Sequence, residues 1–196
     1  MASERRIGSE DSETRSALLD AAQKLMLEEG YPGVTSRRVA ATAGLKPQLV
    51  HYYFRTMDDL YLALFRRGAS LNLERQARAL ASEQPLRALW EFSSEPAGAA
   101  LTTEFLALAN RRPAIRAEIS AYAEQFRSQQ AEALSKLFAS YGIPTDEIPP
   151  AAVLMIMSSI SRVIVLEEGL DMTAGHAETL ALVERYLTML EGPPRH

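Results

Sequence analysis

The chain is 196 residues long, carries 21 Lys and Arg against 25 Asp and Glu, and contains no cysteine. Without cysteine, a disulfide framework, a Cys-based zinc site, an iron–sulfur cluster and a Cys nucleophile are all excluded. The composition, 47% hydrophobic and 23% charged, is that of an ordinary soluble globular protein. The most apolar stretch, residues 151–166, is interrupted by three serines and Arg162, so we expect it to fall short of a bilayer span. These features predict a cytoplasmic protein with no membrane partner.

The charge is unevenly distributed along the chain. Residues 1–67 hold ten basic and nine acidic residues, whereas residues 68–196 hold eleven and sixteen. The window of residues 30–57 contains no acidic residue at all. Its basic residues are Arg37, Arg38, Lys46 and Arg55. A basic window in an acidic chain is typical of a nucleic-acid-binding segment, a property that the net charge of −4 conceals.

Four helices are expected in the first third of the chain, and no stretch alternates for long enough to be a strand. The expected helices cover residues 14–29, 35–43, 47–53, and 56 to beyond 73. Gly30 and Gly44 are placed as helix-ending glycines, and Pro47 as the first residue of the third helix. Thr56 and Asp59 form an approximate capping box at the start of the fourth helix.

Five further helices are expected in the remainder, which gives about nine helices and an all-α fold. They cover residues 85–90, about 101–108, 113–141, 150–168 and 177–190. Pro96 and Gly98 are expected to separate the fifth helix from the sixth. Residues 1–11 and 193–196 are expected to be disordered tails, with a minor-groove arm formed by Arg5 and Arg6 as the alternative.

The second and third helices, joined by a tight turn at Gly44, have the helix-turn-helix arrangement. The third helix has only about two turns, so packing must hold it in place, and Val50 and Phe54 are suited to that role. The residues expected to face outward are Lys46, Gln48, Leu49, His51 and Tyr52. They supply a cation, hydrogen-bonding groups and an apolar side chain, as a reader of the major groove requires. The alternative is an ordinary polar surface helix.

Residues 14–64 carry a specific series of short motifs. They are Gly30-Tyr31, the run from Thr35 to Leu45, the run from Val50 to Phe54, and Asp58-Asp59-Leu60. With these intervals the segment resembles the TetR family of bacterial transcriptional regulators, and the rest of the chain resembles that family in length and helix count. The resemblance implies a helix-turn-helix DNA-binding head at residues 12–57 and a helical ligand-binding and dimerisation domain at residues 58–192.

The resemblance also implies a homodimeric repressor that binds a palindromic operator in double-stranded DNA and is released by a small-molecule effector. The DNA contacts that it implies are Thr35, Ser36, Arg37, Lys46, Pro47, Gln48, Leu49, His51, Tyr52 and Arg55. The family often has a small polar residue where Lys46 stands and a phosphate-binding lysine where Met57 stands, so Arg55 is expected to replace that lysine. Two heads would carry eight basic residues, which predicts a log–log salt slope between about −3 and −7.

The last two predicted helices carry more apolar surface than one core needs. The helix at residues 150–168 is apolar around most of its circumference, and the helix at residues 177–190 has two adjacent apolar stripes. Two stripes predict two neighbours, one of them in a second chain. The expected dimer interface comprises Met157, Ile160, Ile164, Val183, Leu187 and Leu190. The alternative is a fully buried helix in a monomer.

The middle of the chain contains the candidate effector site. Its candidate lining residues are Trp90, Phe105, Tyr122, Phe126 and Met155, although aromatic residues at helical spacing are also typical of a plain core. An acidic, aromatic body predicts an apolar or cationic effector. Phe65 and Leu73 are candidate residues for coupling that site to the head.

Enzymatic activity is not expected. Histidine occurs only at positions 51, 176 and 196, with no metal-ligand spacing, and the chain has no Gly-rich phosphate loop or nucleophile elbow. We therefore expect no metal and no other cofactor. The alternative to a DNA-binding regulator is a helical dimeric protein-interaction module without sequence-specific DNA binding.

Overall fold

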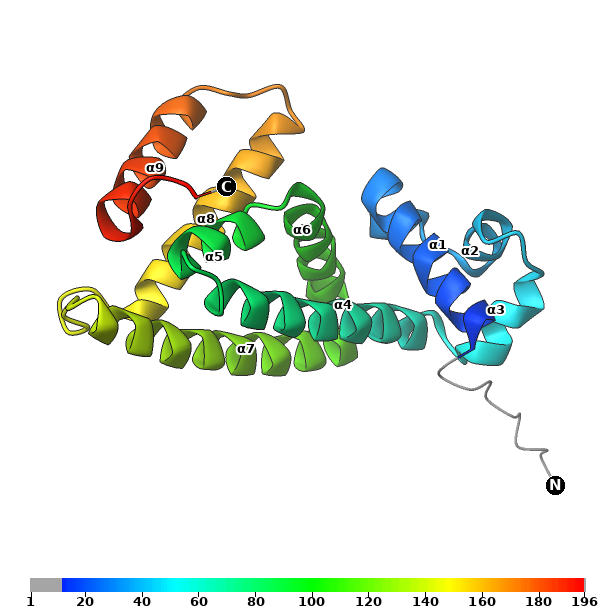
Figure 1. Ribbon diagram of the computed structural model, residues 1–196. Helices are drawn as coiled ribbons and strands as arrows, with labels where there is room; N and C mark the ends of the chain where they lie inside the picture. Colours follow the sequence, from blue (N-terminus) through cyan, green and yellow to red (C-terminus); the bar gives the residue numbers. More distant parts are fainter. Residues whose placement is uncertain (1–11, 196) are drawn as a thin grey trace. The chain divides into compact units, whose positions relative to one another are not determined.

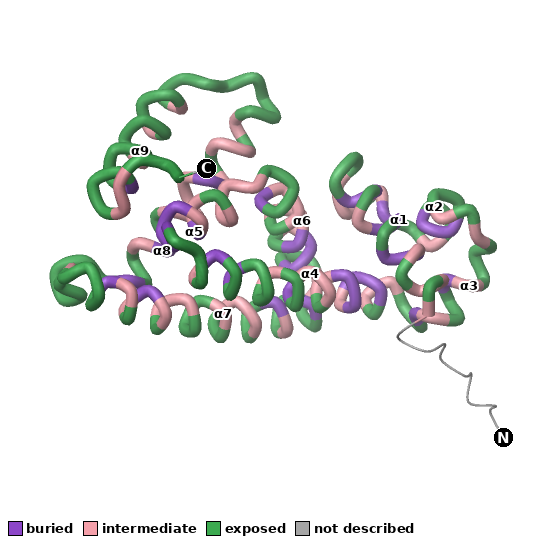
Figure 2. Tube along the Cα trace, in the orientation of Figure 1, coloured by how far each residue is buried: buried purple, intermediate pink, exposed green. Residues whose placement is uncertain are grey.

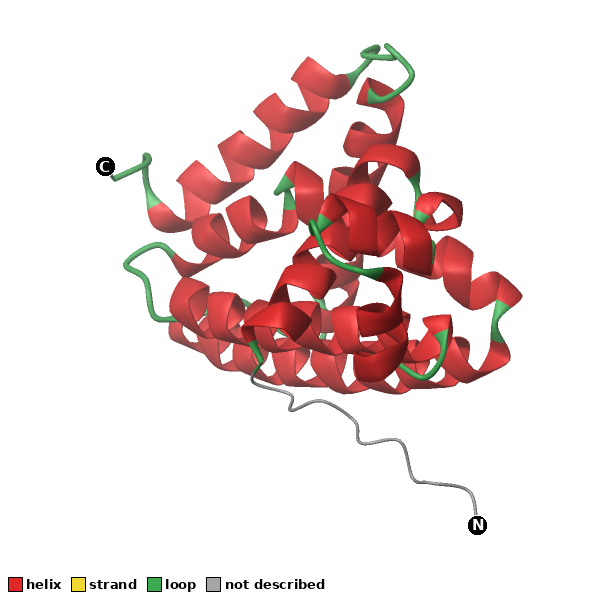
Figure 3. Ribbon diagram, turned by 90° about the vertical axis from the view of Figure 1, so that its right-hand side faces the viewer, coloured by secondary structure: helices red, strands yellow, loops and turns green. Residues whose placement is uncertain are grey.

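The computed structural model describes residues 12–195, and every regular element in that range is a helix (Figures 1 and 3). The elements are α1 (Glu13–Glu29), the 3-10 turn η1 (Tyr31–Gly33), α2 (Ser36–Thr42), α3 (Pro47–Tyr53), α4 (Met57–Leu80), α5 (Pro85–Ser93), α6 (Pro96–Arg111), α7 (Pro113–Ser140), α8 (Pro150–Glu168) and α9 (His176–Glu191). The predicted all-α fold is confirmed. The N-terminal residues 1–11, with the arm suggested for Arg5 and Arg6, lie outside the described residues.

The start of α6 differs from the sequence prediction. Pro96 and Gly98 lie in the first turn of this helix and do not separate it from α5 by a linker. Proline is tolerated there because the first helical N–H groups have no partner within the helix. The Glu95 carboxylate accepts hydrogen bonds from Ala97 N–H at 3.2 Å and from Gly98 N–H at 2.9 Å. Glu95 therefore caps α6, whose start the sequence analysis had placed several residues later because of the proline and glycine.

The chain divides into two compact units within the described range. The first comprises residues 12–69 with 101–119, and the second comprises residues 70–100 with 120–195. Helices α4, α6 and α7 each continue from one unit into the other. The predicted boundary between residues 57 and 58 divides the chain by function and stays a prediction. The compact units divide the chain differently, because the first half of α4 and the segment 101–119 pack with the head.

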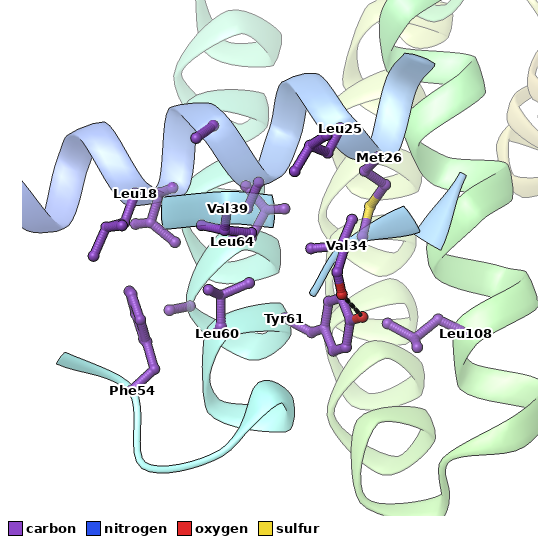
Figure 4. Close-up of a cluster of buried hydrophobic side chains, with 14 of the residues drawn as sticks. Leu18, Leu25, Met26, Val34, Val39, Phe54, Leu60, Tyr61, Leu64 and Leu108 are labelled. Carbon is purple, nitrogen blue, oxygen red and sulfur yellow. Dashed lines mark hydrogen bonds between the residues drawn. The ribbon is translucent and has the colours of Figure 1, made fainter. Parts of the chain in front are cut away.

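The core of the first unit is built from both parts of the chain (Figure 4). Its largest fully buried side chains are Leu18 and Met26 from α1, Val39 from α2, Val50 from α3, Leu60 and Leu64 from α4, Leu108 from α6 and Ile115 from α7. Tyr61 adds a polar link, because its hydroxyl donates to the carbonyl oxygen of Val34 at 3.0 Å. The segment after Leu101 is thus an integral part of the core that supports the head.

The turn between α2 and α3 has the hydrogen bonding of a Schellman motif. Leu45 N–H donates to the Ala40 carbonyl at 2.8 Å, and Gly44 N–H donates to the Ala41 carbonyl at 3.1 Å. Gly44 has a φ of +67°, the left-handed conformation that glycine adopts without strain. This geometry ends α2 and sends the chain directly into α3.

In the second unit, hydrogen bonds and an ion pair join α5 to α9 and the C-terminal segment. The buried guanidinium of Arg87 binds the Glu184 carboxylate at 2.6 and 3.0 Å. Gln84 donates to the carbonyl oxygen of Pro193 at 2.9 Å and accepts from Arg195 N–H at 2.8 Å. The expectation of a disordered tail at residues 193–196 is therefore wrong for 193–195, while His196 lies outside the described residues.

Helix α8 begins and ends at the predicted residues, but it is longer than the apolar stretch 151–166 that was weighed as a bilayer span. It has 19 residues, and an 18-residue window with a mean hydropathy of 1.6 is only 11% buried. By length and composition alone this helix could cross a membrane, so the expectation that the stretch falls short of a span is wrong. One such helix does not establish a membrane segment, but its exposed apolar side chains require an explanation.

Two glycines, Gly44 in the turn between α2 and α3 and Gly68 inside α4, allow a test of the strain argument for that turn. A Cβ at Gly44 or at Gly68, inside α4, would meet no atom within 4 Å. We expect Gly44→Ala to destabilise the protein by about 1 kcal/mol because of its positive φ, and Gly68→Ala to stabilise it by about 0.5–1 kcal/mol through helix propensity. Urea unfolding at a fixed protein concentration measures both. Equal effects of the two substitutions would contradict the strain argument.

Candidate nucleic-acid interface

Helix α3 is held against the head by side chains on its inner face. Val50 and Phe54 are 1% and 2% exposed, and Leu18 of α1 beneath them is fully buried. Tyr53 is partly buried, and its hydroxyl lies 2.8 Å from the Ser12 hydroxyl at the start of α1. The packing expected for this short helix is therefore present, and it fixes which side chains face outward.

The residues predicted to contact DNA lie at the surface of α2 and α3 and just beyond α3. Those classed as exposed are Thr35, Arg37, Lys46, Pro47, Gln48, His51, Tyr52 and Arg55, while Ser36 and Leu49 are partly exposed. The Tyr52 ring is 45% exposed and meets the Tyr53 ring edge-on, with 5.0 Å between centroids. Tyr53 thus orients Tyr52, and the outward surface offers the cations, amide and phenol that groove recognition needs.

Thr35 has a structural role at the start of α2. Its hydroxyl oxygen accepts a hydrogen bond of 3.4 Å from Arg38 N–H, so Thr35 is the N-cap residue. The hydroxyl proton remains able to donate to a phosphate oxygen. At the start of α3, Lys46 occupies the cap position without a side-chain cap, and Pro47 follows as the first helical residue. The Lys46 ammonium is therefore not used in capping α3.

The basic residues of the head are not equivalent. Arg38 forms a bidentate ion pair with Glu29 of α1, and this guanidinium lowers the pKa of the Glu29 carboxyl group. Arg37, Lys46 and Arg55 have no carboxylate partner among the described residues. Each head therefore offers three cations to DNA and not the four counted from the sequence. For two heads, the steepest expected log–log salt slope of DNA binding becomes about −5.

Some contacts around the interface were missed by the sequence analysis. The Glu29–Arg38 pair joins residues nine positions apart across η1, and the Arg15 guanidinium lies over the Phe54 ring at 5.3 Å. Neither has a local spacing that would reveal it. The Ser12–Tyr53 contact likewise spans 41 residues, although a serine just before a helix is a recognisable capping signal.

The segment 101–119 contacts the head through polar groups. Glu104 of α6 accepts a hydrogen bond of 2.7 Å from Tyr31 N–H in η1. Arg112, between α6 and α7, forms an ion pair with Asp58 in the first turn of α4, and its guanidinium lies 5.5 Å from the centroid of the Tyr61 ring. Phe65, a predicted coupling residue, packs edge-on against Phe105 at 5.3 Å.

The predicted effector-site residues do not form one cluster. Phe105 is buried in the core of the first unit, whereas the other four belong to the second unit. There, Tyr122 and Phe126 stack with 5.5 Å between ring centroids, Trp90 packs against the core, and Met155 is 54% exposed. Burial raises the pKa of Tyr122 to about 12, so its phenol stays protonated at neutral pH. The assignment of these residues to a pocket stays a prediction.

The predicted dimer residues also differ in accessibility. Leu187 is only 7% exposed and faces the core of its own unit, which leaves it little surface for a partner. Met157 and Val183 pack partly against the same core. Ile160 and Ile164 are partly exposed, and Leu190 is 37% exposed. The outward stripe of α9 consists of Leu182, Tyr186 and Met189, which the prediction had left out of the interface.

The fold and this surface define a class: an all-helical protein with an N-terminal helix-turn-helix that presents unpaired cations. Residues 18–64 match the family described as "Bacterial regulatory proteins, tetR family". The N-terminal helix-turn-helix is therefore similar to that of the TetR family, as the resemblance predicted. This family consists of regulators and not of enzymes.

One named relative is similar in sequence, and several solved structures are similar in fold. The HTH-type transcriptional regulator BetI of Rhizobium meliloti is 40% identical over 52 residues, about a quarter of the length of either chain. A TetR transcription regulator from Haloarcula marismortui has a TM-score of 0.69 at 20% identity, covering 89% of this chain and 95% of that one. A transcriptional regulator from Saccharomonospora viridis, solved in complex with choline, has a TM-score of 0.64 at 18% identity, covering 80% and 85%. The family match lies in the head, and the solved structures have the same fold over most of the chain.

Arg37 and Arg38 are adjacent yet differently engaged, so they form a matched pair for testing the interface. We expect Arg37→Ala to reduce the magnitude of the log–log salt slope for duplex DNA binding by about one per bound head. Arg38→Ala should leave the slope unchanged, because that guanidinium is occupied by Glu29. Fluorescence anisotropy on a labelled duplex across a KCl series measures both slopes. An equal loss for the two variants would contradict the assignment.

Proposed function

We propose that the protein is a homodimeric repressor that binds a palindromic operator and is released by a small-molecule effector. The observation that carries the proposal is the outer surface of α2 and α3, where Arg37, Lys46 and Arg55 have no carboxylate partner and Gln48 and Tyr52 are exposed. Such a surface binds phosphates with its cations and base edges with its amide. As a DNA-binding regulator, the protein would act in the cytoplasm.

The exposed apolar surface of α8 and α9 supports the dimer. Figure 2 shows that most of these two helices is exposed or partly exposed. The side chains concerned include Met155, Ile156, Val163, Leu166, Leu180, Leu182, Tyr186 and Met189, each more than 40% exposed. Exposed apolar side chains gathered on two helices are typical of an interaction site, and a second copy of the same two helices would cover them. Two-fold symmetry would also give the paired heads that a palindrome requires.

The first unit combines the head with the segment 101–119, and this supports coupling between effector binding and operator binding. Helix α6 continues from the second unit into the segment that holds the head, where Glu104 contacts Tyr31 and Arg112 contacts Asp58. An effector that shifts α6 would therefore act on η1 and on the start of α4. Release of DNA then needs only a difference in effector affinity between two arrangements of the dimer.

The operator is the first element to test. Selection of bound duplexes from random DNA by the purified protein should yield a sequence with two-fold symmetry. On that sequence we expect Gln48→Ala combined with Tyr52→Ala to weaken binding at least tenfold. Nonspecific duplex binding should change much less, because the cations remain.

The control for this experiment is Gln23→Ala, since Gln23 lies on α1 and contacts Arg67. Retention of full operator affinity by the double variant would contradict the proposed reading surface. Recovery of no preferred sequence would instead favour the protein-interaction module.

The dimer makes a separate prediction. Light scattering should give about twice the 21.6 kDa of one chain, and Met189→Glu should give the single-chain mass. Met189 is 68% exposed in the isolated chain, so a carboxylate there disturbs only a surface that a partner covers. Leu71→Glu, at a 51% exposed position of α4, is the matched control and should remain dimeric. A native protein with the mass of one chain would contradict the dimer.

A further inference from the structure

Helices α5 and α9 cap each other's ends. The side-chain amide of Gln84, the residue before α5, donates to the carbonyl oxygens of Glu191 at 3.1 Å and Pro193 at 2.9 Å. In return, the Glu191 carboxylate accepts hydrogen bonds from the first-turn N–H groups of Leu86 at 2.7 Å and Arg87 at 3.0 Å. Backbone groups that helix ends leave without partners are thus satisfied, at the start of α5 and at the end of α9, by the other helix.

Three further side chains take part in this contact, and we call Gln84, Arg87, Tyr141, Glu184 and Glu191 together the α5–α9 polar cluster. Arg87 binds the Glu184 carboxylate with two hydrogen bonds, of 2.6 and 3.0 Å. The Tyr141 hydroxyl donates to the Glu191 carboxylate at 2.7 Å. Burial and this carboxylate raise the pKa of Tyr141 to about 12, so the phenol keeps the proton that it donates. Because Gln84 and Arg87 are buried, water competes little for their hydrogen bonds.

Helix α9 has little apolar attachment to its own unit. Within α9, which is described in full, Leu187 is the one buried residue, and Val183 packs partly against the same core. At the start of the helix, His176 Nε2 lies 2.7 Å from a Glu167 carboxylate oxygen of α8. The position of the last two turns of α9 therefore depends on Leu187 and on the α5–α9 polar cluster.

The polar cluster and the outward apolar stripe lie on opposite sides of α9. Glu184 and Glu191 are seven residues apart and so share the side that meets α5. Tyr186 and Met189, which are exposed, each lie two positions from one of these glutamates. Residues two positions apart on an α-helix point about 200° away from each other. A rotation of α9 that releases the glutamates would therefore turn the outward stripe by the same angle.

We propose that Gln84 and Arg87 are positioning residues for dimer formation, because they hold α9 in the orientation in which its outward stripe fits a second copy of the chain. This inference rests on the proposed function, of which the dimer is a part. A surface that is fixed in advance associates more tightly than one that must be ordered on binding. Both side chains are buried in the single chain, so they act through α9 and not by contact with the partner.

The test is the dimer Kd of the full-length protein, measured by sedimentation equilibrium over a dilution series. We expect Gln84→Ala and Arg87→Met each to raise this Kd at least tenfold, because α9 must then be ordered on association. Arg87→Met should fold, since it leaves the half-exposed Glu184 in water and removes a buried Nε that has no partner among the described residues. Arg87→Lys should retain part of the dimer affinity.

Arg195→Ala is the matched control. Arg195 contacts Gln84 through its backbone N–H, which alanine keeps, and its side chain forms an exposed ion pair with Glu83 at 3.4 Å. An exposed pair of this kind contributes little, so the dimer Kd should stay at the native value.

Amide hydrogen exchange separates positioning from general destabilisation. In the Met189→Glu background, where we expect a single chain, Gln84→Ala should speed exchange at least tenfold in the last two turns of α9 and leave exchange in α1 unchanged. Faster exchange throughout the chain would mean a loss of overall stability and would contradict a positioning role.

Two other outcomes are distinguishable from each other. A native dimer whose Kd is unchanged by both Gln84→Ala and Arg87→Met would overturn this inference and leave the proposed function intact. A native protein with the mass of one chain would refute the proposed dimer, and this inference with it.

Discussion

The outward surface of this protein depends on the anchoring of one seven-residue helix. An isolated helix of that length is unstable in water, because the hydrogen bonds of two turns do not offset the free-energy cost of helix nucleation. Helix α3 exists because Val50 and Phe54 enter the core of the first unit and because the Schellman turn at Gly44 sets the direction in which the chain leaves α2. Lys46, Gln48 and Tyr52 then have fixed positions at low entropic cost on binding, which is what recognition of a rigid groove requires.

The same core is shared with the segment 101–119, and this has a consequence for regulation. Leu108 and Ile115 are fully buried beside the side chains of α1 and α4, and Glu104 and Arg112 add a hydrogen bond and an ion pair to the head. A shift of α6 must either carry η1 with it or break these contacts. The Glu104 hydrogen bond and the Arg112 ion pair are both charge-assisted. Coupling free energies between two binding sites are typically about 1–3 kcal/mol, which is the size of one or two such contacts. No dedicated pathway beyond this shared core is needed.

Local signals predicted the helices well, and they failed where a distant residue decided the outcome. The capping box of Thr56 and Asp59 is present in both directions, at 2.9 and 3.1 Å. Pro47 begins α3 as expected because its effect is confined to the adjacent backbone. The role of Arg38, in contrast, depends on Glu29, which α2 meets only after the chain has turned through η1. Composition alone counts both arginines of the Arg37-Arg38 pair as available to DNA.

Apolar and aromatic residues show the same distinction. Periodicity identified two stripes on α9, but only the fold shows that Val183 and Leu187 face inward while Tyr186 and Met189 face out. Phe105 was grouped with the aromatic residues of the body, yet it packs against Phe65 in the first unit. Spacing along a helix gives the faces of that helix and not the element each face meets. That information comes from long-range packing, which one sequence does not contain.

Unpaired cations have different meanings in the two units because their burial differs. In the head, Arg37 and Lys46 are exposed, and an exposed cation without a partner costs nothing, so their significance depends on the acid-free surface around them. Arg162 is partly buried beside Arg127, where desolvation and repulsion both oppose the charged form. The exposed cations of the head therefore retain their full charge for attracting a polyanion, whereas Arg162 carries its charge against the cost of desolvation.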